Sequence, residues 1–223
     1  MDKKIFILIS LNIIFILYNL LMNNELIYLL IVNIIMFFLT TKSPIIIDNV
    51  GLNPSLIIKN KEYYRLVLSK ICHLDFKHLF YNMLNLIILY YSLDSKINFS
   101  KYIFFHLIIY NIIYISISYL LYFYFKKNYY YKCTSVGFSG IIFGLLHIKY
   151  LFCTTTYKVC NFIIPPEFAV FYDFFISYIE SDKRVNNFGH FVGIITSIIL
   201  IKYSGINFIN KIYYINFKYI FIF

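Results

Sequence analysis

The sequence predicts an all-α fold, a polytopic bundle of helices in a membrane. Of the 223 residues, 61% are hydrophobic and only 13% are charged, and the mean hydropathy is +0.74. A soluble domain carries about 25% charged residues. Backbone amides in lipid must be hydrogen-bonded within the protein, and the apolar runs lack the alternation of barrel strands. Helices are therefore the expected spanning elements.

The apolar runs give the expected helices in order. They fall at about residues 5–21, 26–40, 79–93, 102–125, 140–153, 162–179 and 188–206, and several approach the ~20 residues that cross a bilayer. The first run follows MDKK as in a signal peptide, but no small-residue cleavage site follows it. We therefore expect an N-terminal apolar helix, interfacial or spanning, within residues 1–25, one membrane domain over 26–205 and an interfacial tail over 206–223.

The segment between the second and third runs has a different composition. Residues 41–78 include Pro44, Gly51, Pro54 and several charges, so this segment is too polar to span. We expect it to lie partly in the headgroup layer as a membrane-associated loop. The later connections are short, which predicts antiparallel neighbouring helices.

The formal net charge of +10 does not indicate nucleic-acid binding, because the lysines are scattered singly between apolar runs and suit lipid headgroups instead. The four cysteines, Cys72, Cys133, Cys153 and Cys160, lack CxxC spacing. We expect no disulfide framework, no metal site and no cofactor. The expected surroundings are a lipid bilayer.

Glycine is rare in this sequence, yet five of the seven glycines fall in two short motifs. The first is GFSGIIFG, in which Gly137, Phe138 and Gly140 surround Ser139. The spacing of Gly140 and Gly144 allows two helices to approach closely. Ser139 would lie near a helix start, where free N–H groups suit an oxyanion. The alternative is that this motif serves helix packing alone.

The second motif is GHFVGIITS, which puts small residues at positions 189, 193 and 197 on one helical face beside His190. An ionisable residue inside a span costs a few kcal/mol and is a functional candidate, although a lone histidine can also bond a carbonyl. If the two glycine faces meet, His190 lies beside Ser139. It can then take the hydroxyl proton during attack on a carbonyl.

The third motif is HLDFKHLFYNM, in which His78 and Asn82 stand one helical turn apart on the same face. Both side chains can donate hydrogen bonds to one oxygen, as a site that stabilises a negative charge requires. The alternative is a polar helix start at the membrane surface. We expect His73, which precedes the helix, to fix the loop.

Together these motifs resemble the rhomboid family of intramembrane proteases over about residues 26–205. The family pattern is a tyrosine or tryptophan followed by arginine, then HxxxxHxxxN, GxSGxxxG and HxxGxxxG. Here it appears as Tyr64–Arg65, His73–Asn82, Gly137–Gly144 and His190–Gly193. The order and the loop elements look most similar to the endoplasmic-reticulum type. One departure is Ser197, which stands where a third glycine is usual.

The resemblance implies a rhomboid-like core of six spans and a serine endopeptidase that cleaves transmembrane or juxtamembrane segments of membrane proteins. It implies a Ser139–His190 dyad without a catalytic aspartate, and an oxyanion hole from His78, Asn82 and the Ser139 N–H. Phe143 would stack on the His190 ring. The implied location is the endoplasmic reticulum or another secretory-pathway membrane. The resemblance also implies that water enters from the luminal side, gated by the loop after the fourth core-motif helix and by movement of the fifth span.

Several alternatives stay open. Asp173 is a weak candidate to complete a triad, and we expect His106 and His147 to be packing or interfacial residues. The first rival function is a non-catalytic rhomboid pseudoprotease or derlin-like binder of membrane clients. The second is a transporter or channel, which predicts repeats and mid-span charges, whereas this sequence has no repeat and almost no mid-span charge. Substrate identity, orientation and oligomeric state are not predicted.

Overall fold

The computed structural model describes residues 25–41, 44–93, 96–153, 157–159, 162–180 and 186–203. The helices in this part of the chain are α2 (Glu25–Thr41), α3 (Pro44–Val50), α4 (Pro54–Asn60), α5 (Arg65–Ile71), α6 (Phe76–Leu93), α7 (Phe99–Phe125), α8 (Asn128–Lys132), α9 (Ser139–Cys153), α10 (Pro166–Glu180) and α11 (Asn187–Tyr203). The all-α prediction is confirmed. The N-terminal helix expected over 5–21 and the tail expected over 206–223 lie outside the described residues.

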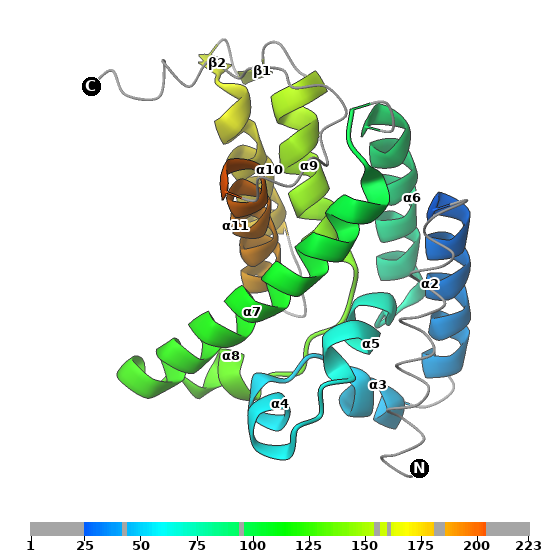
Figure 1. Cartoon of the computed structure of the whole chain (residues 1–223), viewed down its shortest axis with the longest axis vertical. Coiled ribbons are helices and arrows are strands. Elements are labelled where there is room, and N and C mark those ends of the chain that lie inside the picture. Colours follow the sequence, from blue (N-terminus) through cyan, green and yellow to red (C-terminus); the bar gives the residue numbers. More distant parts are fainter. Residues whose placement is uncertain are drawn as a thin grey trace.

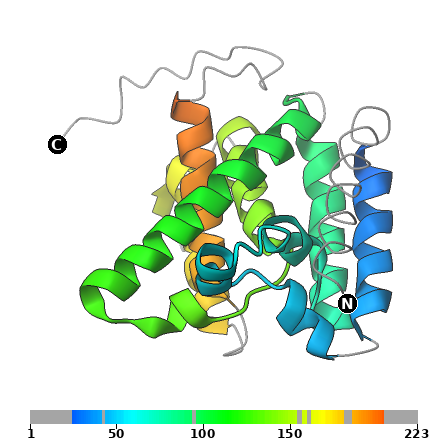
Figure 2. The same ribbon diagram turned by 60° about the horizontal axis from the view of Figure 1, so that its bottom comes forward.

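Helix α9 is the centre of the bundle. It packs against α11, α10, α6 and α7, while α2 packs on the far side of α6. Helix α7 crosses in front of these helices at a steep angle (Figures 1 and 2). The core between α6, α7 and α9 is closed by side chains that are 0–2% exposed, including Leu86, Tyr102 and Leu145. The first residue of α9 therefore lies where several helices meet.

Local capping sets the ends of α7. The side chain of Asn98 accepts a hydrogen bond from the Lys101 N–H at 3.0 Å, and Lys126 ends the helix in a left-handed conformation with φ 54°. The 27 residues between them make a helix about 40 Å long. In the described part of the chain, α7 alone meets both the length and the hydropathy expected of a bilayer-crossing helix, and α2, α9, α10 and α11 are shorter apolar helices.

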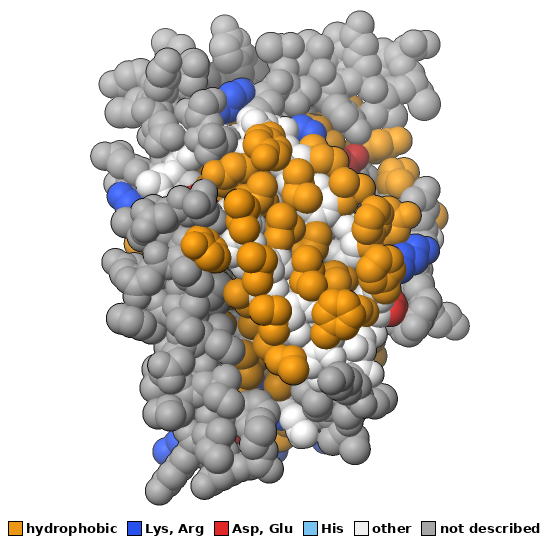
Figure 3. Space-filling model, turned by 90° about the vertical axis from the view of Figure 1, so that its right-hand side faces the viewer, with side chains coloured by type: hydrophobic (Ala, Val, Ile, Leu, Met, Phe, Trp, Pro, Cys, Tyr) orange, Lys and Arg blue, Asp and Glu red, His pale blue; other side chains and the backbone are white. Residues whose placement is uncertain are grey.

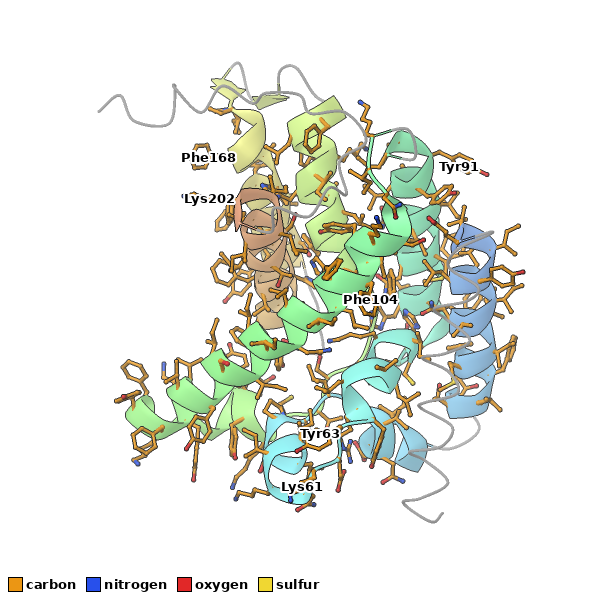
Figure 4. The ribbon with its side chains drawn as sticks, in the orientation of Figure 1. Lys61, Tyr63, Tyr91, Phe104, Phe168 and Lys202 are labelled. Atoms are coloured by element: carbon orange, nitrogen blue, oxygen red, sulfur yellow. The ribbon has the colours of Figure 1, made fainter. Side chains whose placement is uncertain are left out.

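The outer surface of the bundle is apolar. Figure 3 shows one face covered by hydrophobic side chains, and α2 exposes Ile27, Ile31, Ile34, Ile35, Phe38 and Leu39. Tyr91 on α6 and Phe168 on α10 point away from the bundle (Figure 4). Exposed apolar areas this extensive are rare on soluble monomers and suit contact with lipid.

The polar segment expected as a loop contains three short helices, α3, α4 and α5. Arg65 joins α5 to α3 and the turn after it, because it donates to the carbonyls of Asp48 and Gly51 at 2.7 and 2.8 Å. Arg65 also forms an ion pair of 2.7 Å with Glu62. Leu52 exchanges two backbone hydrogen bonds with Ser135, at 2.8 and 3.0 Å. The segment is thus attached to the chain that leads into α9.

The apolar run 162–179 is divided. Phe162–Ile164 is strand β2, which pairs antiparallel with β1 (Tyr157–Val159), and α10 begins only at Pro166. A proline disfavours helical backbone in the residue before it but is well suited to the first position of a helix. The pair Pro165–Pro166 therefore separates strand from helix.

Candidate active site

Two glycines bring α9 and α11 into backbone contact. A Cβ atom added to Gly193 on α11 would lie 2.0 Å from the carbonyl oxygen of Gly140 on α9. No side chain fits in that space. The two glycine faces identified in the sequence therefore lie against each other, as the spacing of small residues suggested.

This contact brings an alcohol and an imidazole together. Ser139 is the first residue of α9 and His190 lies in the first turn of α11. The His190 Nε2 atom lies 2.9 Å from the Ser139 Oγ atom. One turn along α9, the Phe143 ring stacks on the His190 ring with a centroid distance of 4.4 Å and an interplanar angle of 24°. The stacked ring fixes the orientation of the imidazole.

No carboxylate in the described residues joins this pair. The His190 Nδ1 atom is buried and has no hydrogen-bond partner among them. Asp173 on α10 instead accepts a hydrogen bond from the Tyr150 hydroxyl group. The arrangement is a serine–histidine pair, and Asp173 is not its third member.

The turn before α9 requires glycine. Gly137 has φ +122°, and a Cβ at this position would lie 2.6 Å from the His78 ring. Its N–H donates to the Ser69 carbonyl at 2.8 Å. Ordinary L-residues are strained at this φ. Gly137 therefore lets the chain turn into α9 directly against the His78 side chain.

Helix α6 supplies an unpaired donor to the same place. Asn82 is 6% exposed, and its Nδ2 group has no hydrogen-bond partner among the described residues. Buried amide groups are nearly always paired, so an unpaired one requires an explanation. The start of α6 is fixed by Asp75, whose carboxylate accepts from the His78 N–H at 2.8 Å. His78 and Asn82 both line the cavity that contains Ser139.

That cavity has a volume of about 850 Å³ and opens beside the serine–histidine pair. Ser139, Gly140, Phe143 and His190 line one part of it. The walls include Tyr81, Asn82 and Asn85 from α6, Tyr110 and Tyr114 from α7, Tyr129 and Tyr130 from α8, Asp173, Ile176, Ser177 and Tyr178 from α10, and Asn186 and Phe188 beside α11. Pockets of this size accommodate drug-sized ligands.

The remaining predicted residues lie around the cavity and do not line it. His73 is fully buried, with its ring edge-on to His78 at 4.9 Å. Burial and the neighbouring His78 lower the pKa of His73 to about 3, so it stays neutral. Phe138 packs in the core, and Gly144 lies against His106 and Tyr102. Arg65 joins α5 to α3 and is not among the residues that line the cavity.

Asn186 was not singled out from the sequence. Its side-chain oxygen accepts from the Gly189 N–H at 3.1 Å. Its Nδ2 group donates to the Ser135 hydroxyl at 2.7 Å and to the Tyr114 hydroxyl at 3.0 Å. Asn186 therefore ties the start of the His190 helix to the loop before Ser139. An asparagine directly before a helix start is the signal that points to such a cap.

Two further histidines form hydrogen bonds to α11, farther along the helices from the serine–histidine pair. The His106 Nε2 atom lies 3.1 Å from the Gly193 carbonyl. The His147 Nδ1 atom lies 3.0 Å from the Ser197 hydroxyl. Both histidines are buried packing residues with specific hydrogen bonds. Ser197, the departure from the glycine pattern, is the partner of a histidine on the facing helix. Elsewhere in the described residues, no group of three His, Cys, Asp or Glu side chains is placed to hold a metal ion.

Comparison with known proteins gives a family. The sequence model of the Rhomboid domain matches residues 60–205. Among curated proteins, the chain is similar to "Rhomboid-like protein 14, mitochondrial" of Arabidopsis thaliana, with 29% identity over 167 residues. The match covers 71% of this chain and 48% of the relative, so the chain spans about half the length of that protein. No solved structure matches.

Proposed function

This chain belongs to the rhomboid family, and we propose that it is an intramembrane serine endopeptidase that cleaves transmembrane or juxtamembrane segments of membrane proteins. The observation that carries the proposal is the 2.9 Å contact between the Ser139 Oγ and His190 Nε2 atoms, which are 51 positions apart in the sequence. The contact lies in a cavity that also contains an unpaired amide donor, Asn82.

In the proposed first step, His190 Nε2 accepts the hydroxyl proton while Ser139 Oγ attacks the substrate carbonyl carbon. The carbonyl oxygen becomes an oxyanion. The Asn82 Nδ2 group, the His78 ring and the Ser139 N–H are the donors proposed for it. The first residue of a helix has no intrahelical acceptor for its N–H, so that group is available. One such donor is typically worth 10²–10³-fold in rate.

In the second step, the protonated His190 donates its proton to the leaving amine as the scissile C–N bond breaks. Ser139 then carries the acyl group as an ester. Water attacks this ester, His190 takes a proton from the water, and the carboxylic acid product leaves as the serine hydroxyl is restored. The Phe143 ring keeps the imidazole in place through both transfers.

The substrate is proposed to reach the cavity between α6 and α10. Both helices line the cavity and both pack on α9, and they have no extensive contact with each other. A peptide bond inside a regular helix is hydrogen-bonded and shielded by side chains, so the substrate segment must be extended at the cleavage point. A small residue there and a locally unstable substrate helix are expected requirements.

Fluorophosphonate labelling of the purified protein in lipid bilayers tests the proposal. Wild type should be labelled, Ser139→Ala should not be labelled, and His190→Ala should react more slowly. Ser177→Ala is the matched control, because Ser177 lines the same cavity on α10 and its loss should leave labelling unchanged. If the folded wild type is not labelled in bilayers of any composition tested, the protein is the non-catalytic binder of membrane clients.

The membrane in which the protein resides is a separate proposal. Motif similarity favours the endoplasmic reticulum or another secretory-pathway membrane, whereas the Arabidopsis relative is named as a mitochondrial protein. We propose a secretory-pathway membrane on the motif similarity. Fractionation against markers of both membranes decides between the two, and co-purification with mitochondria contradicts the proposal.

A further inference from the structure

Lys70 is a buried cation for which the described residues provide no counter-charge. It lies on α5 and is 5% exposed. Unlike Arg65, which pairs with Glu62, Lys70 has no carboxylate partner among the described residues. Burying an unpaired charge is costly. An ionisable group buried in a membrane protein without a partner is therefore a functional candidate.

The Lys70 side chain is held by aromatic rings. Its Nζ atom lies 3.9 Å from the centroid of the Tyr110 ring and 5.9 Å from that of Tyr114. The face of an aromatic ring attracts a cation at these distances. The titratable groups facing Lys70 are these two phenols and His106, all on α7. Burial lowers the pKa of Lys70 to about 7.

Tyr110 connects this lysine to the active site. A Cβ atom added to Gly140 would lie 2.6 Å from the Tyr110 ring, and one added to Gly189 would lie 2.9 Å from its hydroxyl group. These glycines directly follow Ser139 and precede His190 in the sequence. Tyr110 also lines the cavity. Lys70 therefore lies behind the ring that supports both helix starts.

We propose that Lys70 is a positioning residue of the proteolytic site, whose ammonium group steadies Tyr110 against the starts of α9 and α11 and makes this wall of the cavity electropositive. The inference rests on the proposed proteolytic function. A positive charge behind the wall favours the negatively charged oxyanion over the neutral carbonyl, because the protein interior screens charges much less than water does. The charge thereby acts on the transition state more than on substrate binding.

The test compares Lys70→Met, which removes the charge at similar length, with Lys70→Arg, which keeps it. For a cleavable transmembrane substrate, Lys70→Met should lower kcat about ten-fold with KM unchanged, because the lost charge stabilises the transition state through the partly screened protein interior. The Tm should stay equal or rise, because an unpaired buried charge is removed. Lys70→Arg should keep kcat within about three-fold.

A merely structural role gives a different result. If Lys70 only stabilises the fold, Lys70→Met should lower both Tm and kcat. That result overturns the proposal. Fluorophosphonate labelling of wild type separates this failure from failure of the proteolytic function. If the wild type is labelled and Lys70→Met is labelled equally fast, the proposed role of Lys70 is wrong and the proteolytic function stands. If the wild type is not labelled, the proteolytic function itself is rejected.

The pH profile gives a second readout. With a pKa of about 7, Lys70 is charged below that pH and neutral above it, so the kcat advantage of wild type over Lys70→Met should shrink as the pH rises from 6 to 9. The comparison uses the ratio of the two kcat values at each pH, so that a pH dependence shared by both proteins cancels. If the ratio of wild-type to Lys70→Met kcat is constant across this range, the lower kcat of the variant comes from packing and not from the charge. That result contradicts the proposal.

Discussion

Replacing Gly193 by alanine would test whether the backbone contact between α9 and α11 is what holds the serine and the histidine together. The added Cβ would lie 2.0 Å from the Gly140 carbonyl oxygen, whereas ordinary contact begins at about 3.4 Å. The obstacle is backbone, so no side chain can rotate away. The two helices must therefore separate or slide by roughly 1 Å, and displacements of that size reduce catalysis about 10²-fold.

The assay is the second-order rate of fluorophosphonate labelling at Ser139. Gly193→Ala should react about 10²-fold more slowly than wild type, because the 2.9 Å contact between the two side chains is stretched. Alanine stabilises a helix by about 1 kcal/mol relative to glycine, which partly offsets the free energy that the steric clash costs the fold. Phe191→Leu, an exposed position on the same helix, should stay within two-fold of wild type. A folded Gly193→Ala protein that reacts at the wild-type rate refutes the reasoning.

Two further predictions concern Asn82, the proposed oxyanion donor, and the segment before α6. Asn82→Leu should lower kcat 10²–10³-fold with little change in KM, because the amide is needed only when the oxyanion forms; a change confined to KM contradicts this role. Burial alone would raise the pKa of Glu62, but hydrogen bonds from Arg65 and other neighbours and the Arg65 charge together lower it. Glu62 therefore stabilises the fold above its unfolded-state pKa, and this stabilisation is lost as the pH falls through the lower folded-state value. Glu62→Gln should lower Tm by a few degrees at pH 7 and by much less near pH 3. An equal decrease in Tm at both pH values would show that the Glu62–Arg65 ion pair is not the cause.

Sequence patterns predicted the parts of the fold that local chemistry specifies. Apolar runs marked the long helices to within a few residues, and Pro165–Pro166 explains the one run that divides. The clustering of rare glycines indicated which two helices approach most closely. For Gly140 and Gly193, the contact in the structure is backbone on backbone. Glycine at such positions has a direct steric reason, which is why the pattern was informative.

The missed features depend on contacts between distant segments. Lys70 looked like one of many scattered lysines, and nothing near it in the sequence indicates that Tyr110 lies over it. The three side-chain hydrogen bonds of Asn186 reach residues 3, 51 and 72 positions away. Single-sequence patterns report periodicity and capping, so partners at such separations become visible only when the helices are placed.

The hydrogen bond between His147 and Ser197 has a consequence for how α9 and α11 find their alignment. Helix faces lined with glycine are smooth, and a shift by one small-residue step of about 6 Å would preserve much of their packing. A directional bond between two buried polar groups exists in one register only, as with single polar residues in coiled coils. This bond joins the C-terminal halves of the two helices in one register. It thereby places His190 beside Ser139 and not one turn away from it.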